Sequence, residues 1–212
     1  MRSLVEAAAE AAGCTRCGLA GGRTQVVYGS GRHDADLLFV GEGPGFHEDQ
    51  QGIPFVGAAG QLLNRMLAEV GIRREDVYIA NVVKCRPPGN RDPLPEEITA
   101  CTPWLEEQLA LIDPRVIVTL GNFATRFVLN AQVGITKVRG QRFPVGGRTV
   151  IPTFHPAAIL RGGGDGSRQF EEFRSDFRQV AAALAEPRDA AAPSAPTAQA
   201  TPVAAPEQLG LF

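Results

Sequence analysis

Short apolar runs alternate with helical stripes along most of this chain, and that alternation constrains its fold more than any other feature. The runs cover residues 37–40, 77–83, 116–120 and 149–154. Parallel strands that are buried on both faces are typically continuous apolar segments of this length, joined by helices. The sequence therefore predicts an α/β fold, a three-layer αβα sandwich around a central, mainly parallel four-stranded sheet.

Helices are predicted where apolar residues recur every three or four positions. They cover residues 3–12, the stripe from Leu62 to Val70, a segment from Pro95 to the residue before Pro114, a stretch around Phe123 and Phe127, and the stripe from Phe170 to Leu184. A basic, glycine-containing stretch before residue 149 resembles a hairpin.

The length of the chain allows one good hydrophobic core. Its 212 residues are 44% hydrophobic and 21% charged, enough for one core with a tail left over. Residues 187–206 are rich in alanine and proline and lack apolar periodicity, which predicts a disordered linker. We expect one domain at residues 1–186, this linker at 187–206 and a short terminal peptide at 207–212.

The net charge and the N-terminus limit the partners and the compartment. A formal net charge of -2 does not by itself indicate a nucleic-acid partner. A face that binds nucleic acid would therefore need clustered Arg and Lys. The first ten residues carry acidic side chains where a signal peptide needs an apolar core, and no run reaches membrane-spanning length. We expect a cytoplasmic monomer that does not bind membranes and has reduced cysteines.

Polar residues follow each of the four predicted strands. Glu42 follows the first, Asn81 ends the second, Asn122 follows the third and His155 follows the fourth. Open parallel sheets bind ligands at the carboxyl ends of their strands, so these residues are candidates for one site. Taken singly, each of them is more often a turn residue or a satisfied hydrogen-bonding group.

The loop Gly41-Glu-Gly-Pro-Gly45 presents Glu42 on flexible backbone where an apolar strand ends. A dinucleotide-binding loop is the main alternative, but its glycines should open directly into a helix. Here about a dozen loop residues are expected before the next helix, which disfavours that alternative. A turn that merely needs glycine is the other alternative.

The chain has four cysteines that could bind one metal centre. Cys14 and Cys17 form a Cys-x-x-Cys pair, Cys85 follows the second strand and Cys101 lies on the next helix. Their spacing alone does not distinguish zinc from an iron–sulfur cluster. Buried, inert thiols are a further alternative for Cys85 and Cys101.

Four motifs together resemble one enzyme family. They are Gly41-Glu-Gly-Pro-Gly45, Pro54-Phe-Val-Gly57, Asn81-Val-Val-Lys-Cys-Arg-Pro-Pro88 and His155-Pro-Ala-Ala-Ile-Leu-Arg161. In this order they resemble the iron–sulfur branch of the uracil-DNA glycosylases, family 4, over roughly residues 10–185. The resemblance implies the uracil-DNA glycosylase fold, a structural [4Fe-4S] cluster on the four cysteines, and hydrolysis of the N-glycosidic bond of uracil flipped out of DNA. A non-catalytic iron–sulfur DNA-binding or redox-sensing protein of the same fold is the alternative.

The resemblance also assigns substrate-binding residues. Phe55 would stack on the flipped base, and the amide of Asn81 would accept from uracil N3–H and donate to O4, a pattern that cytosine reverses. Glu48 is the candidate for blocking the methyl group of thymine. Gly41 and Gly43 would let the backbone approach the base.

Two residues are implied to be catalytic. His155 would hydrogen-bond uracil O2 as negative charge develops on the base, a role that needs a donor but no proton transfer. Glu42 would position or deprotonate the attacking water and favour the cationic sugar. The sequence does not decide which contribution of Glu42 is larger.

Contacts with DNA and with a partner protein are implied at other positions. Leu160 and Arg161 resemble a wedge that fills the vacated stack and holds a phosphate, with a core leucine as the alternative for Leu160. Lys84 and Arg86 are further candidates for binding DNA. The terminal peptide Gln208–Phe212 resembles the short segments by which bacterial repair proteins bind the DNA sliding clamp; an inert tail is the alternative.

Overall fold

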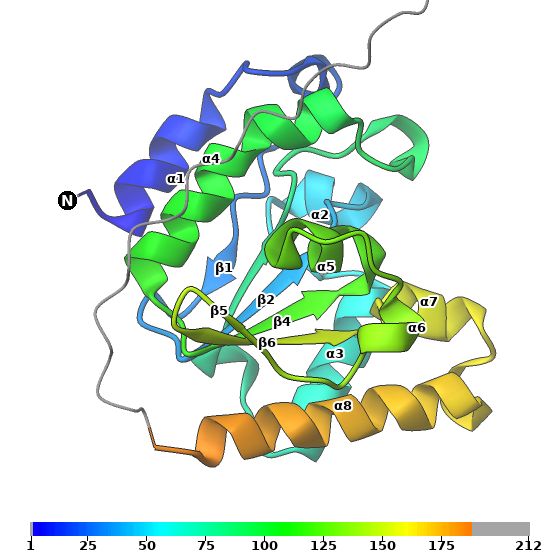
Figure 1. Cartoon of the computed structure of the whole chain (residues 1–212). Coiled ribbons are helices and arrows are strands. Elements are labelled where there is room, and N and C mark those ends of the chain that lie inside the picture. The colour runs from blue at the N-terminus through cyan, green and yellow to red at the C-terminus, as the bar shows by residue number, and fades with distance from the viewer. Residues whose placement is uncertain (1, 188–212) are drawn as a thin grey trace, which may run out of the picture.

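The computed structural model describes residues 2–187, and they form one sheet with helices on both faces (Figure 1). Residues 188–212, with most of the predicted linker and the whole terminal peptide, lie outside the described residues. The sheet has the strand order β1-β3-β2-β4-β6-β5. The strands are β1 Ser30–Gly31, β2 Leu37–Gly41, β3 Tyr78–Asn81, β4 Val116–Leu120, β5 Phe143–Val145 and β6 Arg148–Thr153.

The four central strands are the four predicted from the apolar runs, and they pair in parallel. The predicted count of four strands is nevertheless wrong, because β1 and β5 add antiparallel edges and make six. These edge strands have two and three residues, too few to give a period-two apolar pattern. The pairing of β5 with β6 confirms the predicted hairpin.

Helices cover the two faces of the sheet (Figure 1). They are α1 Leu4–Ala12, α2 Phe46–Gln51, α3 Ala58–Glu69, α4 Pro95–Ile112, α5 Gly121–Leu129, α6 Ile135–Val138, α7 Pro156–Arg161 and α8 Arg168–Ala185. Four short 3-10 helices also occur, η1 Gly18–Gly21, η2 Arg74–Asp76, η3 Pro88–Asn90 and η4 Gly164–Gly166.

Each helical layer packs on its own hydrophobic core. Leu37 and Phe39 of β2 face the core shared with α3 and α8, whereas Leu38 and Val40 face the core shared with α1, α4 and α5. Successive side chains of a strand point to opposite faces, so the continuous apolar run fills both cores. The sheet is therefore buried between two helical layers, which is the predicted three-layer sandwich.

Helix α2 was not predicted. About a dozen loop residues were predicted after Gly45, but α2 begins at Phe46 and ends before Gly52, whose φ is +70°. The reason given against a nucleotide-binding loop was therefore wrong. A better one is that Glu48 and Asp49 lie in the first turn of α2, where their charges repel a phosphate.

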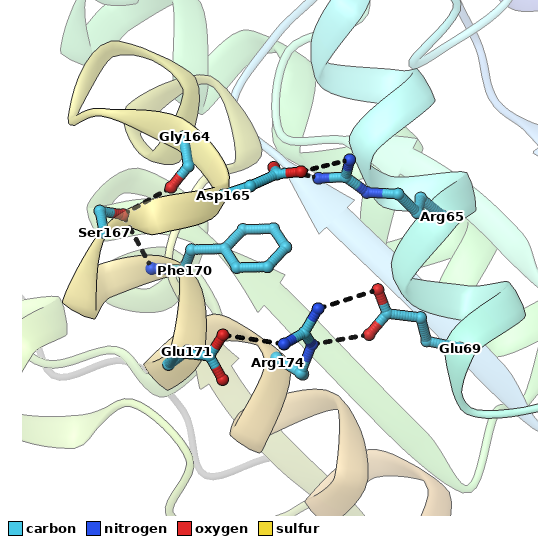
Figure 2. A network of polar contacts seen from close by, with 8 residues as sticks. All are labelled: Arg65, Glu69, Gly164, Asp165, Ser167, Phe170, Glu171 and Arg174. Carbon is cyan, nitrogen blue, oxygen red and sulfur yellow. Dashed lines mark hydrogen bonds and ion pairs between the residues drawn. The ribbon is translucent and has the colours of Figure 1, made fainter.

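A polar network fixes the connection between α7 and α8 against α3, as Figure 2 shows. The Arg65 guanidinium of α3 donates to both oxygens of Asp165 in η4, at 2.5 and 2.9 Å. The Arg174 guanidinium of α8 bridges Glu69 and Glu171. This network holds the segment that follows α7, the helix predicted to insert into DNA.

Candidate active site

The carboxyl ends of β2, β3, β4 and β6 surround one cavity of about 480 Å³. That volume is in the usual range for small-molecule sites. Seven of the predicted site residues line it: Glu42, Gly43, Glu48, Phe55, Asn81, His155 and Arg161. The predicted convergence of polar residues at the strand ends is therefore observed.

Asn81 lies at the base of the cavity beside Gly41, its register partner on β2. Its side chain is 1% exposed, and its Oδ1 is buried without a hydrogen-bond partner among the described residues. A Cβ atom on Gly41 would lie 2.3 Å from this oxygen and 2.7 Å from the Phe55 ring. Glycine at position 41 therefore allows both side chains to pack against the end of β2, and the unpaired Oδ1 is an acceptor ready for a ligand N–H.

The Phe55 ring forms another wall of the cavity and is held by an unusual turn. Phe55 has a φ of +54°, a conformation that costs a non-glycine residue about 1 kcal/mol or more. Glu48 stabilises the turn, because its Oε1 accepts from the amides of Val56 and Gly57, both at 2.9 Å. Glu48 thus positions this loop, and its assigned role against thymine remains a prediction.

His155 faces Phe55 across the cavity, with 5.6 Å between the ring centroids. It is the N-cap of α7, and its Nδ1 accepts from the Ala157 amide at 3.2 Å. Burial, and to a lesser extent the charge of Arg161, lowers the pKa of His155 to about 4. A neutral imidazole whose Nδ1 accepts carries its proton on Nε2, so His155 is a neutral donor at this site.

Glu42 follows β2 on the loop that lines the cavity. Burial and, to a lesser extent, the negative charge of Asp92 raise the pKa of its carboxyl to about 7, against a lowering effect of Arg161. A carboxylate with a pKa near neutrality is suited to act as a base at physiological pH. The same burial therefore favours the neutral form of both Glu42 and His155.

The rim of the cavity carries exposed apolar and basic side chains. Leu160 on α7 is 42% exposed, so the alternative of a core leucine is wrong. Phe46, at the start of α2, is 51% exposed and lies under the Arg86 guanidinium, 5.1 Å from its ring centroid. Arg86 also donates to Asn90 Oδ1, which lies on the cavity wall.

The prediction that Lys84 binds DNA is wrong. Its side chain is 1% exposed, and its Nζ donates to the Asn81 carbonyl at 2.8 Å and to Gln108 Oε1 at 2.5 Å. The apolar run of β3 continues through Val82 and Val83, so the chain is still inside the core at this lysine. No phosphate can reach an ammonium group in that position.

The four cysteines line a second cavity, on the side of the sheet that α1 and α4 cover. Cys17 precedes η1, Cys85 follows β3 and Cys101 lies on α4, so three distant segments meet there. The Lys84 amide donates to Cys101 Sγ at 3.2 Å and Arg23 to Cys85 Sγ at 3.6 Å. Within residues 2–187 no three Cys, His, Asp or Glu side chains are grouped tightly enough to hold a single metal ion.

Comparison with known proteins identifies the family. The model of the uracil DNA glycosylase superfamily matches residues 28–178. The type-4 uracil-DNA glycosylase of Thermotoga maritima is 57% identical over 150 residues, which are 70% of this chain and 78% of that protein. The Archaeoglobus fulgidus type-4 enzyme is 46% identical over 188 residues, 85% of this chain and 92% of that protein. This chain belongs to the type-4 uracil-DNA glycosylases.

A more distant relative is the type-5 uracil-DNA glycosylase of Thermus thermophilus, which is 35% identical over 61% of this chain and 68% of that protein. The family assignment confirms the resemblance drawn from the four motifs. Among the described residues of this type-4 uracil-DNA glycosylase, none of the helices is long and apolar enough to span a membrane.

Several residues that line the cavity of this glycosylase were not predicted from its sequence. Asp92 and Asn90 come from the loop that follows Cys85, and Phe123 and Ile135 come from α5 and α6. Asp92 could be predicted as a site residue only by knowing how its loop folds. In the sequence, an Asp between Arg91 and Pro93 is an ordinary loop residue. Asn122, noted at the end of β4, has a structural role, because its Oδ1 accepts from the Ile135 amide at 2.9 Å.

Proposed function

We infer that this protein excises uracil from DNA by hydrolysing the N-glycosidic bond, which leaves free uracil and an abasic site for base excision repair. The observation that carries this inference is the buried, unpaired Oδ1 of Asn81 in a base-sized cavity of a type-4 uracil-DNA glycosylase. An enzyme acting at this bond must first take the nucleotide out of the stack.

Asn81 and Phe55 select the base. The free Oδ1 of Asn81 accepts from uracil N3–H, and the amide nitrogen donates to O4. Cytosine has an acceptor at N3 and a donor at the 4-position, so it leaves polar atoms of the pocket unpaired. Phe55 stacks on the base, and its buried ring and constrained backbone support a fixed stacking surface.

His155 and Glu42 carry the hydrolysis. As the glycosidic bond lengthens, negative charge develops on uracil and positive charge on the sugar. The Nε2–H of neutral His155 donates to uracil O2 and stabilises the departing anion without transferring a proton. Ionised Glu42 orients or deprotonates the attacking water, and its charge favours the cationic sugar.

The exposed rim contacts the DNA strand. Leu160 inserts where the flipped nucleotide leaves the stack, and Arg161 binds an adjacent phosphate. Arg86 binds the backbone on the opposite side of the cavity. The exposure of Leu160 and the stacking of Arg86 on Phe46 support this path.

Cys14, Cys17, Cys85 and Cys101 would hold a [4Fe-4S] cluster. The four-cysteine set alone would also fit zinc, and the resemblance to the iron–sulfur branch of the family favours the cluster. Three N–H donors on this cavity fit such a cluster. Arg23 donates to Cys85 and the Lys84 amide donates to Cys101. The buried indole N–H of Trp104 has no partner among the described residues. The cluster would tie the N-terminal segment to the core, and it has no part in the hydrolysis.

One assay tests the enzyme. Purified protein is incubated with single- and double-stranded oligonucleotides that contain one uracil, and abasic sites are then cleaved with alkali. Strand scission at the uracil is expected. Intact DNA after incubation with iron-loaded protein would instead favour the non-catalytic DNA-binding or redox-sensing protein.

The terminal peptide Gln208–Phe212 would bind the DNA sliding clamp. Its apolar residues follow an Ala- and Pro-rich stretch that suits a tether. A chain that ends at residue 207 should lose binding to the clamp while its glycosylase rate on short oligonucleotides stays unchanged. Equal clamp binding by the full and shortened chains would refute this role.

A further inference from the structure

Lys84 is the only buried cationic side chain among the residues that the structure describes. Of the three buried carboxylates among the described residues, Glu97 and Asp176 are each paired with an arginine, and Asp49 accepts from the Thr24 amide. By contrast, the ammonium group of Lys84 contacts only neutral groups: it donates to the Asn81 carbonyl and the Gln108 amide oxygen, and it lies 5.7 Å from the centroid of the Tyr28 ring. None of the ion pairs within residues 2–187 involves Lys84. Burying a cation without an opposite charge is costly, so an anionic group is expected nearby.

The four-cysteine site supplies that anionic group. Lys84 precedes Cys85 in the chain, its amide donates to Cys101 Sγ, and it lines the same cavity as the four cysteines. A four-iron cluster bound by four thiolates has a net negative charge. Arg23 donates to Cys85 Sγ from a less buried position, and Lys84 is the fully buried cation beside the site.

The ammonium end of the Lys84 side chain contacts the backbone of Asn81, a residue that lines the uracil pocket. Its Nζ donates to the backbone carbonyl of Asn81, the residue whose amide reads the base. Gln108, the second acceptor, lies on α4 together with Cys101, and its Nε2 donates to the Tyr28 carbonyl at 2.8 Å. One side chain therefore joins the end of β3 to the helix that carries a cysteine.

The choice of lysine at this position also has a physical reason. The chain has 21 basic residues, of which only Lys84 and Lys137 are lysines. An arginine would bring five N–H donors into a space with two acceptors, whereas an ammonium group is a compact charge with three donors. A buried site that needs charge and few hydrogen bonds therefore favours lysine.

We propose that Lys84 is a positioning residue that couples the four-cysteine site to the uracil pocket. Its ammonium group balances the thiolate-bound cluster and fixes the backbone of Asn81, so that the side-chain amide meets the uracil edge. This inference rests on the proposed function, both for the cluster and for the role of Asn81.

The test compares Lys84→Met, which keeps a similar volume, with Lys137→Met, which removes the other lysine from an exposed position on α6. The rate of iron loss to a chelator measures cluster retention. The inhibition constant of free uracil measures the pocket without the chemical step. In Lys84→Met, we expect iron loss to be about tenfold faster and uracil inhibition about tenfold weaker, as fits loss of a charge-assisted hydrogen bond. Lys137→Met should stay within about twofold of wild type for both.

A Gln108→Met variant tests the same link if Lys84→Met does not fold. It keeps the charge and removes one acceptor, so uracil inhibition should weaken while iron is retained. Wild-type values of both constants in folded Lys84→Met, or unchanged uracil inhibition in Gln108→Met, would overturn the inference. Wild-type protein that lacks iron or does not release uracil would instead refute the proposed function.

Discussion

At the scale of single residues, the site combines two ionisable groups that burial has shifted in opposite directions. Burial raises the pKa of Glu42 to about 7 and lowers the pKa of His155 to about 4. Between those values His155 is a neutral donor, while Glu42 gains its charge as the pH rises. The fall of kcat/KM at acid pH, the acid limb, should therefore follow the protonation of Glu42 and not that of His155.

The substitution Asp92→Asn should move that acid limb to lower pH. The charge of Asp92 raises the pKa of Glu42, so removing it stabilises the ionised, active carboxylate. In the wild type, kcat/KM should fall about tenfold per pH unit below about pH 7, because the free enzyme must hold Glu42 ionised. The measurement is kcat/KM against pH, with the exposed Glu106→Gln as control. An acid limb at the wild-type pH in Asp92→Asn would contradict this account of Glu42.

The substitution His155→Ala should lower kcat by about 100- to 1,000-fold, the usual effect of removing a donor to a developing anion. The affinity for uracil-containing DNA should change less than about threefold, because the donor matters chiefly in the transition state. Single-turnover rates and binding titrations measure the two effects, with the exposed His33→Ala as control. A parallel loss of affinity and rate would show that His155 binds the ground state.

At the scale of elements, the turn at Phe55 depends on close approach by α3. A Cβ atom on Gly60 would lie 1.8 Å from the Phe55 carbonyl oxygen, so this contact fixes the helix against the turn. Phe55 itself closes the pocket. The distance between α3 and the turn therefore affects both stability and substrate binding.

The substitution Gly60→Ala should lower the free energy of unfolding by about 2 kcal/mol or more, since the backbone must move to relieve the overlap. It should also raise KM, because the Phe55 ring shifts with its turn. Gly134→Ala is the matched control, as its Cβ would meet nothing within 4 Å. Urea denaturation and steady-state kinetics measure the two effects. Equal stability of both variants would mean that α3 moves away freely.

The central elements of the fold could be predicted because their signals are local. The four parallel strands are continuous apolar runs, and helices such as α8 have a clear apolar stripe. The six-residue helix α2 begins directly after a Gly-Pro-Gly segment and is too short for a periodic pattern. The edge strands β1 and β5 are shorter still, and they exist because longer neighbours offer free hydrogen-bonding edges.

The site was predictable where polar residues lie at or just after the ends of strands, as Glu42, Asn81 and His155 do. The burial of Lys84 and the effect of Asp92 on Glu42 were not, because each depends on how a loop packs in three dimensions. The stabilising role of Glu48 is a contact between α2 and a turn eight residues further along the chain. Such contacts leave no pattern in the sequence.

At the scale of the whole molecule, the cysteine site joins the N-terminal segment to the rest of the fold. Cys14 and Cys17 follow α1, which packs on α4, where Cys101 lies. Burial raises the pKa of Cys85 to about 11 and also raises that of Cys101, so a bound metal centre is needed to hold them as thiolates. The proposed cluster would thus convert three separate segments into one unit.

The substitution Cys17→Ala should therefore lower both the iron content and the stability of the domain. Metal binding contributes directly to folding, and a loss of about 3 kcal/mol should lower Tm by about 10 °C in a domain of this size. The first 23 residues should become sensitive to proteases, because α1 then relies on packing alone. Thr15→Ala, an exposed change between the two cysteines, is the control for effects of the loop itself. Since Glu42, Asn81 and His155 lie at the strand ends, uracil release well below the lowered Tm should persist at a reduced rate. An iron-free Cys17→Ala protein with the wild-type Tm would show that the cysteine site does not hold the N-terminal segment in place.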